Sequence, residues 1–129
     1  MACIKKIKAL LICPNELPKV VEIPNTLKSF QAQVNGKIAV SYLLKDDDVC
    51  LICNDEGKFN LSKPNRSIEH DIIYDNFLIV GDDYVKGDFK SLTKEQILKY
   101  QKLFDKDSIT RTQNKINARK LVKAKFSRR

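Results

Sequence analysis

The sequence has few of the residues that usually mark catalytic or nucleotide-binding loops. Its 129 residues include four glycines, one histidine and no tryptophan. No glycine belongs to a phosphate-cradling loop, so we do not expect a nucleotide-hydrolysing enzyme. The single histidine, His70, lies between Glu69 and Asp71, with no recognisable nucleophile or metal-ligand set beside it. We therefore favour a protein that is not an enzyme, and a small enzyme that uses His70 is the lowest-ranked hypothesis.

The four cysteines lack the spacing of a zinc or redox site. Cys50 and Cys53 lie in a predicted strand, three residues apart, so strand alternation points them to opposite faces. Cys3 and Cys13 are at the two ends of another predicted strand. We interpret the cysteines as small buried residues and expect no metal or other cofactor. The acidic run 46–48 lacks the alternating spacing of a calcium loop and is interpreted as a turn.

Long hydrophobic runs are also missing. The apolar run Ala9–Cys13 is five residues long and is closed by Pro14. That is too short for the centre of a signal peptide or for a membrane span. We interpret it as a buried strand and expect a cytoplasmic protein that has reduced cysteines and does not bind membranes.

The remaining pattern predicts an α+β domain. Apolar segments indicate strands at 5–13, 20–23, 37–44, 48–55 and 76–81, and helical spacing indicates helices near 26–35 and 93–104. We expect Gly36 to end the first helix in a left-handed conformation and Gly81 to end the last of these strands. Thr93 and Gln96 have the spacing of a capping box. The expected fold is a mainly antiparallel sheet of about five strands, packed by two helices and followed by a basic helical extension.

Residues 60–75 show no clear periodicity and are predicted to form an irregular loop. Arg66 stands out there, flanked by the turn-forming residues of "PNRS". Two roles are open for it: holding an anion or a partner's carboxylate, or bracing the loop by bonding backbone carbonyls. We favour the structural role.

Positive charge is confined to one end of the chain. Residues 1–105 contain 15 basic and 15 acidic side chains, whereas residues 106–129 contain nine basic side chains and one acid, Asp107. The whole formal charge of +8 therefore lies in the last 24 residues. A neutral domain with a basic appendage indicates an anionic partner. The residues predicted to bind it are Arg111, Lys115, Arg119, Lys120, Lys123, Lys125, Arg128 and Arg129.

We divide the chain into a domain at 1–105 and an extension at 106–129, and we expect the domain to fold without the extension. The extension is predicted to be helical, with Ser108 as its cap. Its sparse apolar residues are predicted to form a narrow stripe: Ile109, Ile116, Leu121, Val122 and Phe126. Two binding hypotheses follow. The extension binds nucleic acid or a nucleoprotein, or its helix occupies a groove of a partner protein as an inhibitor. Nothing in the sequence marks an oligomer interface.

The order of several short segments resembles a known family. "EIPNTL", "ICNDEGK", "PNR" and "SLTKEQ", spread over about residues 7–104, are similar to the domain of unknown function 3846 family of bacteria, phages and mobile elements. The resemblance implies an accessory protein of a phage or mobile element, acting in the host cytoplasm. It also suggests a host-defence antagonist of the anti-CRISPR or antirestriction type. The basic extension lies beyond the family pattern.

Overall fold

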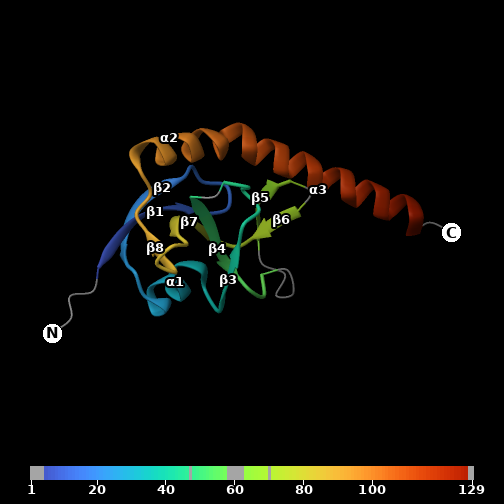
Figure 1. The fold of residues 1–129 in the computed structure, drawn as a ribbon. Coiled ribbons are helices and arrows are strands. Elements are labelled where there is room, and N and C mark those ends of the chain that lie inside the picture. Colours follow the sequence, from blue (N-terminus) through green and yellow to red (C-terminus); the bar gives the residue numbers. More distant parts are fainter. Residues whose placement is uncertain (1–4, 47, 58–62, 70, 128–129) are drawn as a thin grey trace.

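A computed structural model describes residues 5–46, 48–57, 63–69 and 71–127, with side chains as far as residue 122. The antiparallel sheet and its helices (Figure 1) confirm the predicted α+β class. The elements are β1 (Lys6–Ile12), β2 (Lys19–Pro24), α1 (Leu27–Val34), β3 (Ile38–Ser41), β4 (Val49–Asn54), β5 (Pro64–Ile68), β6 (Asp71–Tyr74), β7 (Phe77–Asp83), β8 (Asp88–Lys90), α2 (Lys94–Leu103) and α3 (Lys106–Ser127).

The main sheet has the strand order β2-β1-β7-β4-β3. A sixth strand, β8, is not part of this linear order and pairs with Gly81–Asp83 at the end of β7. All strand pairs of the main sheet are antiparallel. β1 and β2 form an antiparallel hairpin, and β1 lies between β2 and β7. This inner position explains why the centre of β1 is apolar on both faces.

Strand alternation divides the core into two clusters, one on each face of the sheet. On one face Leu10 and Ile12 pack with Tyr100 and Phe104. On the other face Ile7 and Ala9 pack in the cluster that includes α1. Figure 1 shows α1 on one side of the sheet and α2, followed by α3, on the other. The layer that contains α2 and α3 therefore lies on the face with Leu10 and Ile12.

The cysteines of β4 follow this alternation. Cys50 is buried in the cluster on the α1 side, and Cys53 packs against the opposite cluster. Burial raises the pKa of the Cys50 thiol to about 12. The predicted opposite orientation is confirmed, and Cys13, Cys50 and Cys53 are free thiols. Cys3 lies outside the described residues.

The prediction of an irregular loop at 60–75 is wrong for Pro64–Ile68 and Asp71–Tyr74, which are strands. β5 and β6 form a two-stranded antiparallel sheet, with a register shift between Pro64 and Arg66. Ile68 and Ile73 of this pair are buried in the core cluster that contains Tyr100. Two short strands with a bulge carry little periodicity, so packing on the main core, rather than local pattern, stabilises them.

Three predicted boundaries also change. The strand predicted over 37–44 ends at Ser41, whose hydroxyl accepts from the Leu43 N–H. Asn35, rather than Gly36, is the left-handed cap of α1, with φ of 65°. Asn tolerates this conformation better than most residues. Gly81 does not end β7: a Cβ there would lie 2.7 Å from the Lys90 carbonyl oxygen, so the glycine permits close pairing with β8.

The capping box of α2 is confirmed, since Thr93 Oγ1 accepts from the Gln96 N–H and Gln96 Oε1 accepts from the Thr93 N–H. Ser108 is not the cap of α3, because the helix begins two residues earlier. Asp105 Oδ1 instead accepts from the Ser108 N–H at 3.2 Å. In the part of the chain that the structure describes, no helix is both long and apolar enough to cross a membrane.

Candidate functional site

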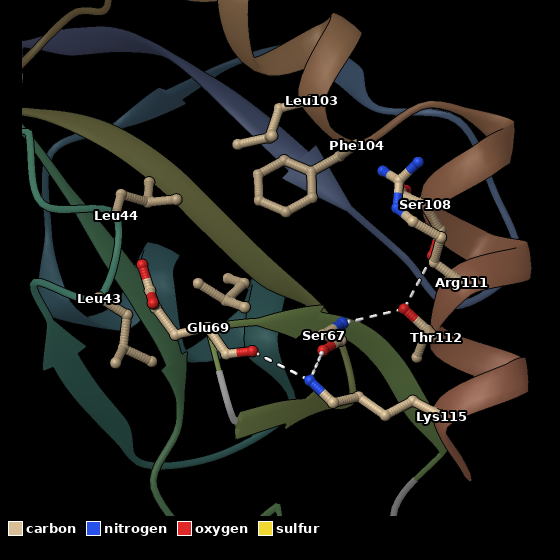
Figure 2. A pocket seen from close by; sticks show the side chains of 11 residues that line it. Leu43, Leu44, Ser67, Glu69, Leu103, Phe104, Ser108, Arg111, Thr112 and Lys115 are labelled. Carbon is tan, nitrogen blue, oxygen red and sulfur yellow. Dashed lines mark hydrogen bonds between the residues drawn. The ribbon is translucent and has the colours of Figure 1, made fainter. Parts of the chain in front are cut away.

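The first half of α3 is attached to β5 through polar groups. Ser108 and Thr112 are buried. Ser108 Oγ accepts from Arg66 Nε at 2.8 Å, and Thr112 Oγ1 accepts from the Ser67 N–H at 2.9 Å. One turn further, Lys115 Nζ donates to Ser67 Oγ and to the Glu69 carbonyl, each at 3.0 Å (Figure 2). The extension is therefore not independent of the domain over its first ten residues.

Arg66 is fully buried at this junction and has the structural arrangement favoured from the sequence. Beyond Ser108, its guanidinium donates to the carbonyls of Asn65, Glu16 and Phe104 and to Asn65 Oδ1. These contacts use all five N–H donors of the guanidinium. Burial lowers the pKa of Arg66, and the nearby Asp105 carboxylate acts in the opposite direction. Arg66 thus ties β5 to the β1–β2 turn, to the end of α2 and to α3.

The predicted binding residues of α3 begin in this attached half and continue past it. Arg111, Lys115 and Arg119 recur every four residues, so they follow one side of the helix at intervals of about 6 Å. Arg111 and Arg119 are exposed, and Lys115 is half-buried. Arg111 has no hydrogen-bond or ion-pair partner among the described residues. We call these three side chains the basic ridge.

The other predicted binding residues lie toward the C-terminus. Lys120 is exposed on α3. Lys123 and Lys125 belong to the helical backbone, and Lys123 continues the four-residue spacing in the sequence. Arg128 and Arg129 lie outside the described residues. Figure 1 shows α3 passing over the domain and extending beyond β5 and β6, and its residues 117–122 are exposed.

The narrow apolar stripe predicted for α3 does not form. At about 100° per residue, Leu121 lies roughly 140° around the helix from Ile116, and Val122 lies roughly 100° from Leu121. Leu121 and Val122 are 71% and 54% exposed. The distal helix therefore has scattered apolar side chains and no amphipathic face.

A pocket of about 370 Å³ opens beside the attached half of α3. Figure 2 shows Leu43 and Leu44 on one side, α3 on the other, and Leu103 and Phe104 at the end of α2. The full lining is Leu43, Leu44, Ser67, Ile68, Glu69, Leu103, Phe104, Ser108, Arg111, Thr112 and Lys115. Two residues of the basic ridge, Arg111 and Lys115, therefore border a hollow whose other lining residues are nearly equally divided between apolar and polar side chains.

The remaining candidates are His70 and the acidic turn at 46–48. His70 lies outside the described residues. Among the residues the structure does describe, there is no group of three or more His, Cys, Asp or Glu side chains suited to a metal ion. Asp46, in the acidic turn, accepts from the Tyr100 hydroxyl at 2.7 Å and pairs with Lys99 at 3.3 Å. Hydrogen bonding to Tyr100 lowers the pKa of Asp46, and this carboxylate serves to attach α2.

Comparison with known families divides the molecule at the start of α3. The model of the domain of unknown function 3846 family (DUF3846) matches residues 7–105. The chain belongs to this family. No curated protein and no solved structure matches it. The family domain ends one residue before α3, so the basic ridge lies outside the matched segment although its base packs on the domain.

Sequence reasoning found the basic residues of α3 but missed the groups that hold the helix and form the pocket. Ser108, Thr112 and Lys115 recur at helical spacing, but a polar row of this kind also occurs on ordinary exposed helix faces, so it did not indicate contact with β5. Leu43 and Leu44 lie in a segment predicted as strand, and Leu103 lies in a segment predicted as helix, so neither prediction indicates a pocket. The pocket depends on how four separate segments meet: residues 43–44, residues 67–69, the end of α2 and the first half of α3.

Proposed function

We propose that the protein is a non-enzymatic binding protein that binds nucleic acid through α3. The observation that carries this proposal is the combination of a firmly attached helix base with a distal half that is basic and exposed. Arg119 and Lys120 lie there, and the sequence adds four more basic residues and no acid as far as residue 129. Basic groups along an exposed helix match the spaced negative charges of a phosphate backbone.

The expected binding is electrostatic and has little sequence preference. Neutralising phosphates releases condensed counterions, so each contact adds about −0.9 to the slope of log K against log salt on duplex DNA. Six contacts by the nine basic groups of the extension correspond to a slope of about −5. Affinity therefore falls by orders of magnitude between low and physiological salt.

Two variants of equal net charge test the role of α3. In the first, six basic residues of the distal helix are replaced by Gln: Arg119, Lys120, Lys123, Lys125, Arg128 and Arg129. In the control, six exposed lysines of the domain are replaced by Gln: Lys6, Lys28, Lys86, Lys90, Lys94 and Lys102. Binding to a fluorescent nonspecific duplex and to RNA is measured by anisotropy across a salt series.

We expect the helix variant to lose most of the salt-dependent affinity and the control to keep it. Equal losses in both variants would show that net charge, rather than the helix, attracts the nucleic acid. Absence of salt-dependent binding by the unaltered protein at low ionic strength would refute the proposal.

A second candidate is an inhibitor whose distal helix occupies a groove of a partner protein. The exposed Leu121 and Val122 favour it, because a partner could bury them. Replacing both by Ser separates the two functions. Nucleic-acid binding through the basic residues survives this change, whereas docking in an apolar groove is lost.

We place this binding in the setting that the family resemblance implies, an accessory protein of a phage or mobile element whose target is a host-defence nucleoprotein. Isolation of complexes from hosts that carry defence systems tests this setting. Recovery of a defence component with the unaltered protein, and not with the helix variant, is the expected result. Recovery with both the unaltered protein and the helix variant would point to a surface other than α3.

A further inference from the structure

The pocket beside α3 is lined by two kinds of side chain, apolar and polar. Leu43, Leu44 and Leu103 supply aliphatic surface, and the lining also includes Phe104, whose side chain is buried in the core and 2% exposed. Polar groups stand at its border: the guanidinium of Arg111, which has no partner among the described residues, and the carboxylate of Glu69. Glu69 is partly neutralised by Lys45, whose Nζ lies 3.7 Å from Glu69 Oε1. The pocket therefore suits an apolar body that bears both hydrogen-bond donors and a nearby negative charge.

This combination favours a nucleobase over an apolar carboxylate. A fatty acid or a hydrophobic C-terminal residue has an anionic head to pair with Arg111, but its apolar body offers Glu69 no hydrogen-bond donor. A base buries a flat π-face between apolar side chains and presents N–H groups that a carboxylate accepts. Its attached phosphate then lies outside the pocket, on the side where Arg111 and Lys115 stand.

The position of the pocket next to the basic ridge also indicates which form of nucleic acid fits. Arg119 follows Lys115 by one turn, so phosphates leaving the pocket can run along α3. A base that is stacked within a duplex cannot enter a side pocket without being unpaired, which costs a few kcal/mol. Single-stranded nucleic acid avoids this cost.

We propose that the pocket lined by Leu44, Leu103 and Phe104 receives one unstacked base of a single-stranded nucleic acid, while Arg111 and Lys115 contact the adjoining phosphates. The inference rests on the proposed binding through α3. It adds a preference for single strands and a defined position for one base.

The test uses three probes on the full-length protein: a 12-nucleotide single-stranded DNA, the same strand in a duplex, and a 12-nucleotide abasic strand of equal charge. We expect the normal single strand to bind roughly tenfold more tightly than the abasic strand, which is the order of one stacked base. Two charge-matched variants on α2 then locate the effect. Leu103→Glu alters the pocket, and Leu98→Glu alters an equally accessible position of the same helix; their side chains are 47% and 58% exposed.

We expect Leu103→Glu to abolish the preference for the normal over the abasic strand, and Leu98→Glu to retain it. Equal affinity of the unaltered protein for the normal and abasic strands would overturn the inference and leave the proposed function standing. Retention of the preference by Leu103→Glu would also overturn it. Failure of every probe to bind would remove both the inference and the proposed function. The comparison of strands on the unaltered protein needs no variant, so it holds even if Leu103→Glu folds poorly.

Discussion

The consecutive helices α2 and α3 are attached to the domain by different chemistry. α2 has a capping box and buries Tyr100 and, at its C-terminal end, Phe104 in the core. α3 buries two small polar side chains, Ser108 and Thr112, and is held by hydrogen bonds from β5. Apolar burial is non-directional, so a helix held by it can shift slightly at little cost. Hydrogen bonds depend on distance and angle, so a helix held by several of them has one defined position.

The same comparison separates the roles of the two helices. α2 lies inside the family domain and completes its core. α3 lies outside the family match, and beyond its attached half it has no buried side chain among the described residues. We infer that α3 is an element for binding, held at a defined angle by Arg66 and its neighbours.

The largest expected effect comes from removing the buried cation beneath α3. Arg66→Met keeps most of the side-chain volume but leaves the buried acceptors of Asn65, Phe104 and Ser108 without their donors. We expect a loss of about 3–4 kcal/mol in the free energy of unfolding, measured in urea. Arg66→Lys should recover little, because an ammonium cannot span these acceptors. The exposed Arg111→Met is the control, and an equal loss there would contradict the structural role of Arg66.

Two truncations compare the halves of α3. The sequence predicts that residues 1–105 fold alone, but the structure adds that this cut removes the partners of Arg66 and of the Ser67 N–H. We expect a loss of about 2–4 kcal/mol after removal of 106–129, and less than about 0.5 kcal/mol after removal of 119–129. Thermal and urea unfolding measure both. Equal stability of the two truncations would mean that α3 contributes nothing to the fold.

The smallest expected effect concerns the polar contact of α2. Tyr100→Phe removes the hydroxyl that donates to Asp46, at a cost of about 1 kcal/mol at neutral pH. The folded-state pKa of Asp46 lies below its ordinary value, chiefly because of this bond. Its contribution is therefore present above the unfolded-state pKa and is lost as pH falls through the lowered folded-state pKa.

Stability curves for Tyr100→Phe and the unaltered protein should therefore converge in acid. Tyr84→Phe, at an exposed tyrosine, is the control and should follow the unaltered protein at every pH. A constant difference between Tyr100→Phe and the unaltered protein down to the acid limit would show that Asp46 is not the partner that matters.

Much of the candidate site could be predicted from the sequence because charge is a property of composition. The concentration of basic residues after Asp105 and the helical character of that segment needed no structure. The attachment of α3 to the domain could not be predicted, because Ser108 and Thr112 resemble ordinary surface residues in the sequence. Only the fold brings them into contact with Arg66 and Ser67. The pocket was missed for the same reason, since Leu44 and Leu103 are distant in sequence and become neighbours only through packing.

The sequence by itself determined the α+β class, the central strands, the capping box of α2 and the location of the charge, because these follow from local periodicity and composition. Tertiary structure decided the β5–β6 pair, the burial of Arg66 and the angle at which α3 leaves the domain (Figure 1). The physical reason is that directed hydrogen bonds between distant segments leave no periodic trace in the chain. They become visible only when the groups that donate and accept are brought within about 3 Å of each other.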